Sequence, residues 1–368
     1  MFTEEWPDNF DLPRPPPFPG TIGDRPLVVH LDQWCWDRIA RDRAGVSRDQ
    51  PDTGIHGFLL EKAVAGDVVF PLSQAHYREN WSRTNDDARW DTSVVMAELS
   101  GFNTISNDGV AEWEALLAAS WLFDREVDPV RPDVFGWGIG HCFSGMDTGA
   151  QIDRAMEVIS TALGGNESNT REQLAGIRLN LAHRLELALL ARRDPRLERA
   201  RLIEPYPPVD DAKGESFRQQ QLQLRKHLGT SPTALAVRNQ IEVLSFIDSE
   251  PLLARAAVKL GLPSHSIASA VERGEKSAVH DLLQQMPVQR VFTEMRVQAH
   301  LKDSFGWRSS DCVDFLALAC TAPFVDGLVV DQKTFHLAHD AGVGLRLALG
   351  IFRALADLRV TLEHLFGG

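Results

Sequence analysis

Four acidic residues bracket a helix and a strand in the last sixty residues of the chain. The segment from Ser310 to Lys333 reads S-D-C-V-D-F-L-A-L-A-C-T-A-P-F-V-D-G-L-V-V-D-Q-K. Clustered carboxylates repel one another and cost stability unless a cation or protons neutralise them. Oxygen ligands suit Mg²⁺ or Mn²⁺ better than zinc, and these cations commonly serve phosphate chemistry. The segment therefore indicates a metal site built from Asp311, Asp314, Asp326 and Asp331.

A plainer interpretation exists for Asp311 and Asp314, which stand at the start of an expected helix. Residues three apart share one helix face. A helix N-terminus favours anions, so capping alone accounts for one of the two. Because Asp326 and Asp331 are close in sequence to this pair, we favour a metal site for the four acids together.

Two further acids follow expected strands near the start of the chain. Asp32 comes directly after L-V-V-H-L, and Glu79 ends the segment P-L-S-Q-A-H-Y-R-E, which follows the next strand. In a parallel α/β sheet, ligands collect beyond the carboxyl ends of the strands. We therefore expect Asp32, Glu79 and Asp331 to meet at one edge of such a sheet.

The elements that position these acids follow from the apolar spacing. Short aliphatic runs predict buried strands, and apolar residues three and four apart predict helices. Strands alternating with helices are typical of an α/β fold with a central parallel sheet. The strands are expected at Leu27–Leu31, Val68–Leu72, Gly327–Val330 and Leu345–Ile351, and the helices at Trp34–Ala44, Ile55–Ala65, Gln74–Trp81, Asp91–Leu99, Cys312–Thr321, Lys333–Asp340 and Phe352–Leu365. For the last strand and helix, one continuous helix over 345–365 is the alternative.

Residues 111–300 have a different, helical pattern without a fixed repeat period. We interpret them as a large all-helical insertion between two halves of one α/β domain, 21–110 and 301–368, preceded by an extended Pro-rich arm at 1–20. Its helices are expected at Glu112–Phe123, Ile152–Leu163, Arg171–Arg193, Phe217–Leu228, Thr233–Phe246, Leu252–Leu260, His265–Arg273, Ser277–Gln285 and Val288–His300.

Composition restricts the class of protein. The chain of 368 residues is 43% hydrophobic and 24% charged, with a net charge of −13 and four cysteines. No apolar stretch approaches the roughly 20 residues of a membrane helix, and an acidic start is atypical of a signal peptide. Cysteines without C-x-x-C pairs argue against zinc knuckles and disulfides. We expect a cytoplasmic protein without membrane contact. Its negative charge disfavours a general nucleic-acid coat protein.

The acidic motifs resemble those of the PIN-domain nucleases and their bacterial PIN-like relatives. The resemblance lies in L-V-V-H-L-D around Asp32, in the segment ending at Glu79, and in S-D-C-V-D…A-P-F-V-D-G-L-V-V-D-Q-K. Ser310 stands where the family commonly has Asn, and Val330 where it has Thr. The resemblance covers Pro26 to Ser106 and Arg308 to the C-terminus, under half of the chain.

This resemblance implies a three-layer α/β/α fold and a Mg²⁺- or Mn²⁺-dependent hydrolase of phosphodiesters. The implied catalytic residues are Asp32, Glu79, Asp311 and Asp331, with Asp314 and Asp326 as further metal ligands. An endoribonuclease, in the role of a toxin or defence effector, is the leading hypothesis. The alternatives are a DNA nuclease of the same chemistry and a catalytically silent scaffold that binds a protein partner through the helical insertion.

Other candidate residues have bland interpretations beside the functional ones. His76 could orient a carboxylate or touch phosphate, or be a partly buried surface histidine. Trp34 and Trp36 lie close enough in sequence to Asp32 to stack a base. The glycine run Gly136–His141 lacks the spacing of a nucleotide loop. Local positive charge for a substrate could come from the basic string between Ala191 and Arg201, or from Arg78, Arg83, Arg89 and Lys333.

Overall fold

The computed structural model describes residues 26–46, 52–125, 134–143, 152–153, 156, 170–192, 212–229, 232–274 and 277–366. The expected arm at 1–20 lies outside these ranges. Most of the expected helix Ile152–Leu163 and of the basic string from Ala191 to Arg201 does as well.

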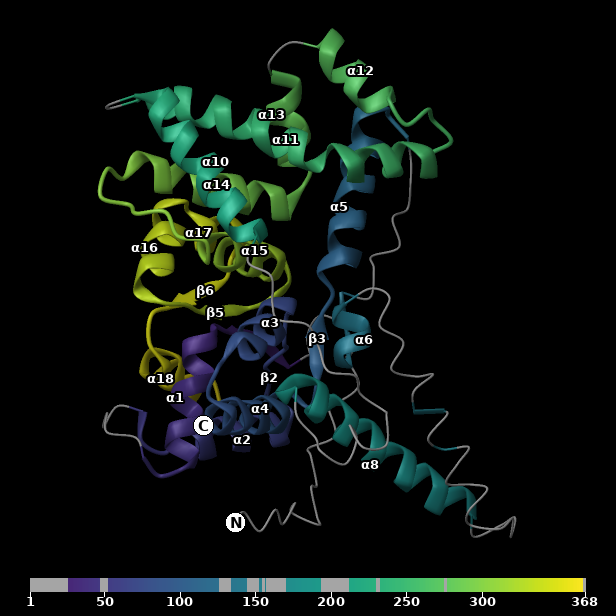
Figure 1. Cartoon of the computed structure of the whole chain (residues 1–368), viewed down its shortest axis with the longest axis vertical. Helices are drawn as coiled ribbons and strands as arrows, with labels where there is room; N and C mark the ends of the chain where they lie inside the picture. The colour runs from purple at the N-terminus through teal and green to yellow at the C-terminus, as the bar shows by residue number, and fades with distance from the viewer. Residues whose placement is uncertain are drawn as a thin grey trace.

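A parallel sheet of four strands forms the centre of the α/β part, in the order β2-β1-β5-β6 (Figure 1). The strands are β1 (Leu27–Leu31), β2 (Val68–Val69), β5 (Gly327–Val329) and β6 (Gly350–Phe352). β1 pairs with β5 in register Val29 to Gly327, so segments about 300 residues apart become neighbours. The predicted α/β class with a parallel sheet is confirmed.

Alternate residues of the central strands enter two separate hydrophobic cores. Val29 and Val329 belong to the first core, whereas Val28 and Leu328 belong to the second. This period of two is that of a strand buried on both faces. The first core is covered by α1 (Gln33–Arg43), α2 (Ile55–Ala65), α4 (Asp86–Ser100), α8 (Thr170–Ala191) and α18 (Leu355–Phe366).

The second core is covered from the other side of the sheet, as Figure 1 shows. Its apolar side chains include Phe292 and Met295, and also Phe315. They pack against Leu328 of β5. The covering helices are α14 (Pro287–Leu301), α15 (Asp311–Thr321), α16 (Gln332–Asp340) and α17 (Val343–Leu347).

Capping residues set the ends of the early helices. α2 ends at Gly66, whose φ of 78° is left-handed and suits glycine. α3 (Gln74–Ser82) begins after Ser73, as predicted. α4 starts five residues before its predicted start, because the Asn85 side chain accepts a hydrogen bond of 3.1 Å from Ala88 N–H.

The prediction that residues 111–300 are entirely helical is wrong. β4 (Phe135–Trp137) lies inside this range and pairs with β3 (Asn103–Ile105) in an antiparallel ribbon that was not predicted. Strands of three residues are too short to establish an alternating pattern in the sequence. Helices expected in this range are also present, among them α5 (Asn107–Leu122) and α10 (Ala212–Leu228), and the short helix α6 (Gly138–Cys142) contacts the ribbon.

Two predicted helices are in fact one. α11 (Ala234–Lys259) continues through Pro251, where a break between Phe246 and Leu252 was expected. An interior proline costs about 3 kcal/mol. Burial offsets that cost, because apolar residues of α11 such as Leu253 pack against α5 in a third core. α12 (Ser266–Arg273) and α13 (Ser277–Gln284) follow close to their predicted positions.

The predicted strand Leu345–Ile351 is wrong in its first half. Left-handed residues at Gly342 and Ala348 bound the short helix α17, and the strand β6 starts only at Gly350. Leu345 is 94% exposed, so the apolar pattern that predicted a buried strand included a residue that is not buried.

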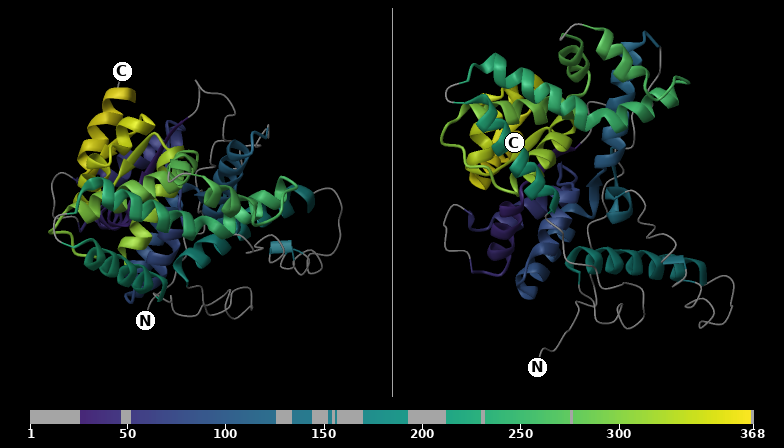
Figure 2. Two further views of the ribbon diagram at one scale, coloured as in Figure 1. Left: turned by 90° about the horizontal axis from the view of Figure 1, so that it is seen from above. Right: turned by 45° about the horizontal axis from the view of Figure 1, so that its top comes forward.

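The helical block α10–α14 packs against the side of the sheet that α15–α17 cover (Figure 2). Residues on both sides of the predicted boundary at position 300 therefore share one core, as Phe292 and Phe315 show. Within the described ranges, no helix is long and apolar enough to cross a membrane.

Candidate functional site

Asp32 and Asp331 meet at the carboxyl edge of the sheet. Asp32 follows β1, and Asp331 follows the neighbouring strand β5. The backbone N–H of Asp331 donates to Oδ2 of Asp32 at 3.2 Å. The two acids therefore lie next to each other, as predicted, although 299 residues separate them in the sequence.

Both acids also cap helices. Oδ1 of Asp32 accepts from Gln33 N–H at 2.7 Å at the start of α1. Asp331 accepts from Lys333 N–H at 2.7 Å and from the Thr334 hydroxyl at 2.6 Å at the start of α16. Capping fixes the carboxylates at this edge, where helix N-termini favour negative charge.

Glu79 from α3 and Asp314 from α15 complete the cluster. With Asp32 they line a cavity of about 20 Å³, which is room for one water molecule. Burial, followed by the charges of Asp314 and Asp32, raises the pKa of Glu79 to about 8. Burial, followed by the charges of Asp32, Asp311 and Asp331, raises the pKa of Asp314 to about 7.

Burial is also the largest cause that raises the pKa of Asp32 to about 6, with the charge of Asp331 adding to it. Hydrogen bonds from the backbone oppose the shift. The cluster thus holds carboxylates whose mutual repulsion is only partly compensated. A bound cation would relieve it.

Asp311 differs from its neighbours because it is already compensated. It is 1% exposed and accepts from Arg308 N–H at 2.7 Å. The Lys333 ammonium forms an ion pair with it and lies 4.2 Å from the centre of the Phe305 ring. Asp311 therefore contributes to the cluster indirectly, because it forms an ion pair with Lys333.

Asp326 lies away from the other acids, at the opposite end of β5. Its Oδ2 accepts from Val28 N–H at 2.9 Å, at the start of β1. Asp326 precedes β5 whereas Asp331 follows it, so a strand separates the two. Spacing along the chain had grouped them, but an extended strand puts its two ends on opposite edges of the sheet. The expected role of Asp326 as a metal ligand does not fit this position.

His76 is fully enclosed, not on the surface. Its Nδ1 accepts from Ser73 N–H at 2.9 Å, and its Nε2 donates to the carbonyl of Leu31 at 2.6 Å. Trp36 Nε1 donates to the same carbonyl at 3.1 Å. Burial lowers the pKa of His76 to about 4, so the ring is neutral. His76 ties α3 to the end of β1 and leaves no nitrogen for phosphate.

His30 was missed by the sequence interpretation. Its ring stacks on His76 with centroids 4.8 Å apart, and it lines the cavity beside Asp32. Its Nδ1 is buried and has no hydrogen-bond partner among the described residues. The one signal in the sequence was a histidine inside the apolar run L-V-V-H-L.

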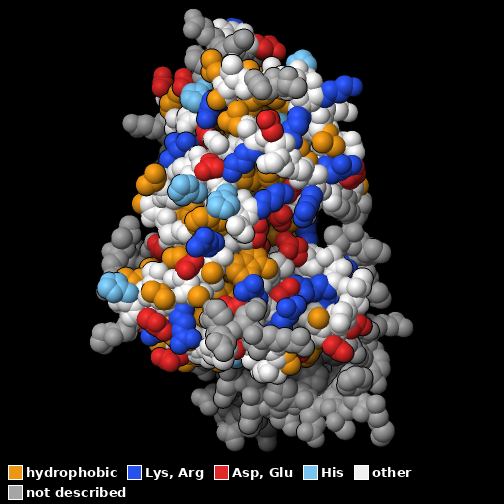
Figure 3. All heavy atoms as spheres, turned by 90° about the vertical axis from the view of Figure 1, so that its left-hand side faces the viewer, with side chains coloured by type: hydrophobic (Ala, Val, Ile, Leu, Met, Phe, Trp, Pro, Cys, Tyr) orange, Lys and Arg blue, Asp and Glu red, His pale blue; other side chains and the backbone are white. Residues whose placement is uncertain are grey.

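The residues proposed to attract or stack a substrate are mostly engaged. Arg83 pairs with Asp37, and Trp36 is completely buried, so it cannot stack a base. Trp34 remains partly exposed, with the guanidinium of Arg38 5.1 Å from its ring centre. Figure 3 shows one face on which basic side chains surround acidic ones near mid-height. Such interleaving gives no broad basic groove on that face.

The donor set of the cluster is oxygen only, which fits a hard divalent cation. In the described part of the chain, no three His, Cys, Asp or Glu side chains already stand in the arrangement of a metal-binding group. The carboxylates would therefore have to draw closer around an ion. No protein-family model, curated protein or solved structure matches this chain significantly.

Proposed function

We propose that the chain is a metal-dependent phosphodiester hydrolase with a PIN-like three-layer fold, most active on RNA. The observation that carries the proposal is the convergence of four carboxylates, from four separate segments, at the carboxyl edge of a parallel sheet. Raised pKa values within a cleft are typical of functional carboxylates. The four residues are Asp32, Glu79, Asp314 and Asp331.

These residues would hold Mg²⁺ or Mn²⁺, which supplies a Lewis acid to phosphodiester hydrolysis when bound. The helix caps hold Asp32 and Asp331 in position, and α3 contributes Glu79. The Lys333 ammonium offsets the negative charge of Asp311 and thereby limits the electrostatic repulsion between Asp311 and the cluster. The toxin or defence role proposed from the resemblance is one setting for such an activity.

The test uses the purified full chain with single-stranded RNA and DNA of one sequence, in Mn²⁺ and in EDTA. We expect cleavage in Mn²⁺ only. The double variant Asp32→Asn/Asp331→Asn should lose about 100-fold or more in rate, because asparagine still caps a helix but does not bind a cation well.

Asp326→Asn is the matched control, because it makes the same chemical change at the other end of β5. It should leave the rate and the Mn²⁺ affinity within about twofold of the wild type. Absence of cleavage of either substrate, together with equal Mn²⁺ affinity of the wild type and the double variant, would overturn the proposal. Faster cleavage of DNA would assign the same chemistry to a DNA nuclease.

A second candidate, a silent PIN-like scaffold, is favoured by the ion pair between Lys333 and Asp311. A lysine already supplies part of the positive charge that a cation would bring. In a scaffold, Asp32→Asn combined with Asp314→Asn should raise the free energy of unfolding by relieving repulsion, and Mn²⁺ should not bind. In the enzyme, Mn²⁺ should stabilise the wild type and not this variant.

A further inference from the structure

His30 occupies a strand position where an aliphatic side chain would be the more stable choice. It lies in β1 between Val29 and Leu31 and is 4% exposed. A buried polar group without a hydrogen-bond partner costs about 1–3 kcal/mol. Groups of this kind commonly mark a bound water, a bound ion or a catalytic role. The partner of the His30 ring is therefore to be sought outside the polypeptide.

The two ring nitrogens of His30 differ in their surroundings. Nδ1 is fully enclosed and has no hydrogen-bond partner among the described residues. Nε2, the nitrogen farther from the backbone, is not enclosed in this way. The ring of His76 stacks on His30 with centroids 4.8 Å apart, so a ligand would meet the edge of the imidazole, where the nitrogens lie. Because His30 lines the acidic cavity, Nε2 is the nitrogen that can bind its occupant.

Three carboxylates from three parts of the fold line the same cavity. Asp32 follows His30 by two residues in extended chain, so both side chains lie on the same side of it. Glu79 comes from α3 and Asp314 from α15. The volume of about 20 Å³ leaves room for one water-sized occupant, which would lie close to all of these groups. His30 and the acids thus share one occupant.

An imidazole among carboxylates has a definite preference for metal ions. Burial lowers the pKa of His30 well below its usual range, so the ring is neutral. Neutral imidazole is the form that binds a metal. Mg²⁺ prefers oxygen ligands only, whereas first-row transition-metal ions also bind imidazole nitrogen. The presence of His30 beside the acids therefore favours a transition-metal ion.

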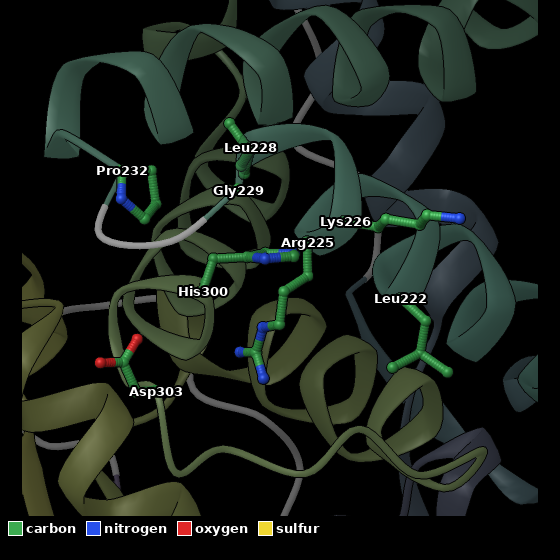
Figure 4. Close-up of a pocket in the computed structure, with 8 residues that line it drawn as sticks. All are labelled: Leu222, Arg225, Lys226, Leu228, Gly229, Pro232, His300 and Asp303. Atoms are coloured by element: carbon green, nitrogen blue, oxygen red, sulfur yellow. The ribbon is translucent and has the colours of Figure 1, made fainter.

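A second buried histidine shows that an unpartnered nitrogen alone is not enough. His300 of α14 is also 4% exposed, and its Nδ1 also lacks a partner among the described residues. It lines a pocket of about 550 Å³ in which Arg225 lies beside it (Figure 4). The charges of Arg225 and Arg296 act on this ring and would repel a metal ion. His30 differs because the charged neighbours in its cavity are acids.

We propose that His30 is a nitrogen ligand, through Nε2, of the metal bound by the carboxylate cluster, and that the site therefore takes a transition-metal ion such as Mn²⁺ in preference to Mg²⁺. This ligand role rests on the proposed function and adds to it the identity of the ion. Among the described residues, no three such side chains stand ready-arranged for a metal. Binding therefore includes a movement of these side chains toward the ion.

The direct measurement is pulsed electron paramagnetic resonance of Mn²⁺ bound to the metal-depleted full chain. A histidine ligand gives Mn²⁺ a magnetic coupling to a nitrogen nucleus that oxygen ligands do not give. We expect this coupling in the wild type and its loss in His30→Phe, which keeps an aromatic ring against His76 and has no ring nitrogen. His300→Phe is the matched control, because it makes the same change at the other buried histidine, and it should keep the coupling.

Calorimetric titration with Mn²⁺ and with Mg²⁺ gives the second readout. His30→Phe should weaken Mn²⁺ binding about tenfold or more and Mg²⁺ binding less than about threefold. His300→Phe should change neither affinity by more than about twofold. Equal losses for the two ions in His30→Phe would show that His30 only maintains the shape of the site, and would overturn its role as a ligand.

The wild-type measurement does not depend on the folding of a variant. Isotopic labelling of histidine nitrogen should change the coupling, and His76 cannot account for it because both of its nitrogens are engaged by Ser73 N–H and the Leu31 carbonyl. Bound Mn²⁺ without nitrogen coupling, or a coupling that labelling or His30→Phe leaves unchanged, would overturn the role of His30 and leave the proposed hydrolase in place. Binding of neither ion by the wild type would overturn both.

Discussion

At the scale of single residues, the acids of this protein differ in what compensates their charge. Asp311 has an ammonium, and Asp326 has a backbone N–H at the far end of its strand. Glu79 and Asp314 are buried beside other carboxylates; burial, followed by the charges of those neighbours, raises the pKa of both. Like carboxylates held together in this way are costly without a cation. The difference in compensation separates the proposed ligands from acids that serve the fold.

Glu114 gives a pH dependence that does not involve the cluster. It lies in α5, is completely buried, and its Oε2 accepts from Val288 N–H at 2.8 Å at the start of α14. Burial raises its pKa from 4.5 to about 8. The folded protein therefore holds this proton more tightly than the unfolded chain. The stability that results is complete below pH 4.5 and is lost as the pH rises through about 8.

Glu114→Gln keeps an oxygen acceptor for Val288 N–H and cannot ionise. Between about pH 5 and pH 8, we expect the free energy of unfolding of the wild type to fall relative to this variant by about 1.4 kcal/mol per pH unit. Urea unfolding at several pH values measures the difference. Parallel curves for the wild type and Glu114→Gln would contradict the assignment.

Sequence spacing predicted the residue-level site where topology alone decides position. Asp32 and Asp331 follow adjacent parallel strands, so the fold class was enough to bring them together. Asp326 was grouped with Asp331 although the expected strand Gly327–Val330 already separated the two, and the two ends of a strand lie at opposite edges of a sheet. Glu114 was not singled out from the sequence, because its partner Val288 is 174 residues away. Hydrogen bonds between residues that are far apart in the chain produce no local pattern in the sequence.

At the scale of elements, the link between α3 and β1 controls where Glu79 stands. His76 joins Ser73 N–H, at the start of α3, to the Leu31 carbonyl, one residue before Asp32. Trp36 donates to the same carbonyl from α1. His76 is therefore a positioning residue that sets α3 over the edge of the sheet.

His76→Asn keeps an acceptor for Ser73 N–H and removes the bond to Leu31. We expect the free energy of unfolding to fall by about 1–3 kcal/mol, the cost of a lost buried hydrogen bond. Hydrogen exchange in Gln74–Ser82 should become faster than in α4. Trp36→Phe is the comparison, because it removes the other donor to the same carbonyl and leaves α3 attached. Equal acceleration of α3 in both variants would contradict a specific role for His76.

Long amphipathic helices and aliphatic strands were predicted well, whereas short or tertiary-determined elements were not. α2 has its predicted bounds because Gly66 is an unambiguous C-cap. The ribbon of β3 and β4 was missed because each strand has three residues. α11 passes through Pro251 only because burial against α5 outweighs the local preference to break. Such balances depend on contacts that a local window of sequence does not contain.

At the scale of the whole molecule, the helical block and the α/β part are joined by a common core. Val288, Phe292 and Met295 of α14 pack in the same cluster as Phe315 and Leu328. An independently folded insertion would instead have its own core and a polar boundary. α14 is thus a layer of the sheet domain, although the sequence groups it with residues 111–300.

The last prediction concerns removal of that block. In a chain with residues 111–300 replaced by a short Gly-Ser linker, the face of β5 that carries Leu328 loses its cover. Removing four large apolar side chains of α14 costs on the order of 10 kcal/mol, which is comparable with the total stability of a domain, about 5–15 kcal/mol. The four are Val288, Val291, Phe292 and Met295.

We therefore expect the deleted chain to lose its near-ultraviolet circular dichroism and to bind a hydrophobic dye, as chains without fixed packing do. A second deletion, of 111–286 only, keeps α14 and should recover part of the native signal, because the two chains differ only in residues 287–300. If the first deletion instead unfolds in a single sharp transition at native-like stability, residues 111–300 form a true insertion. The core shared through α14 would then be dispensable to the sheet.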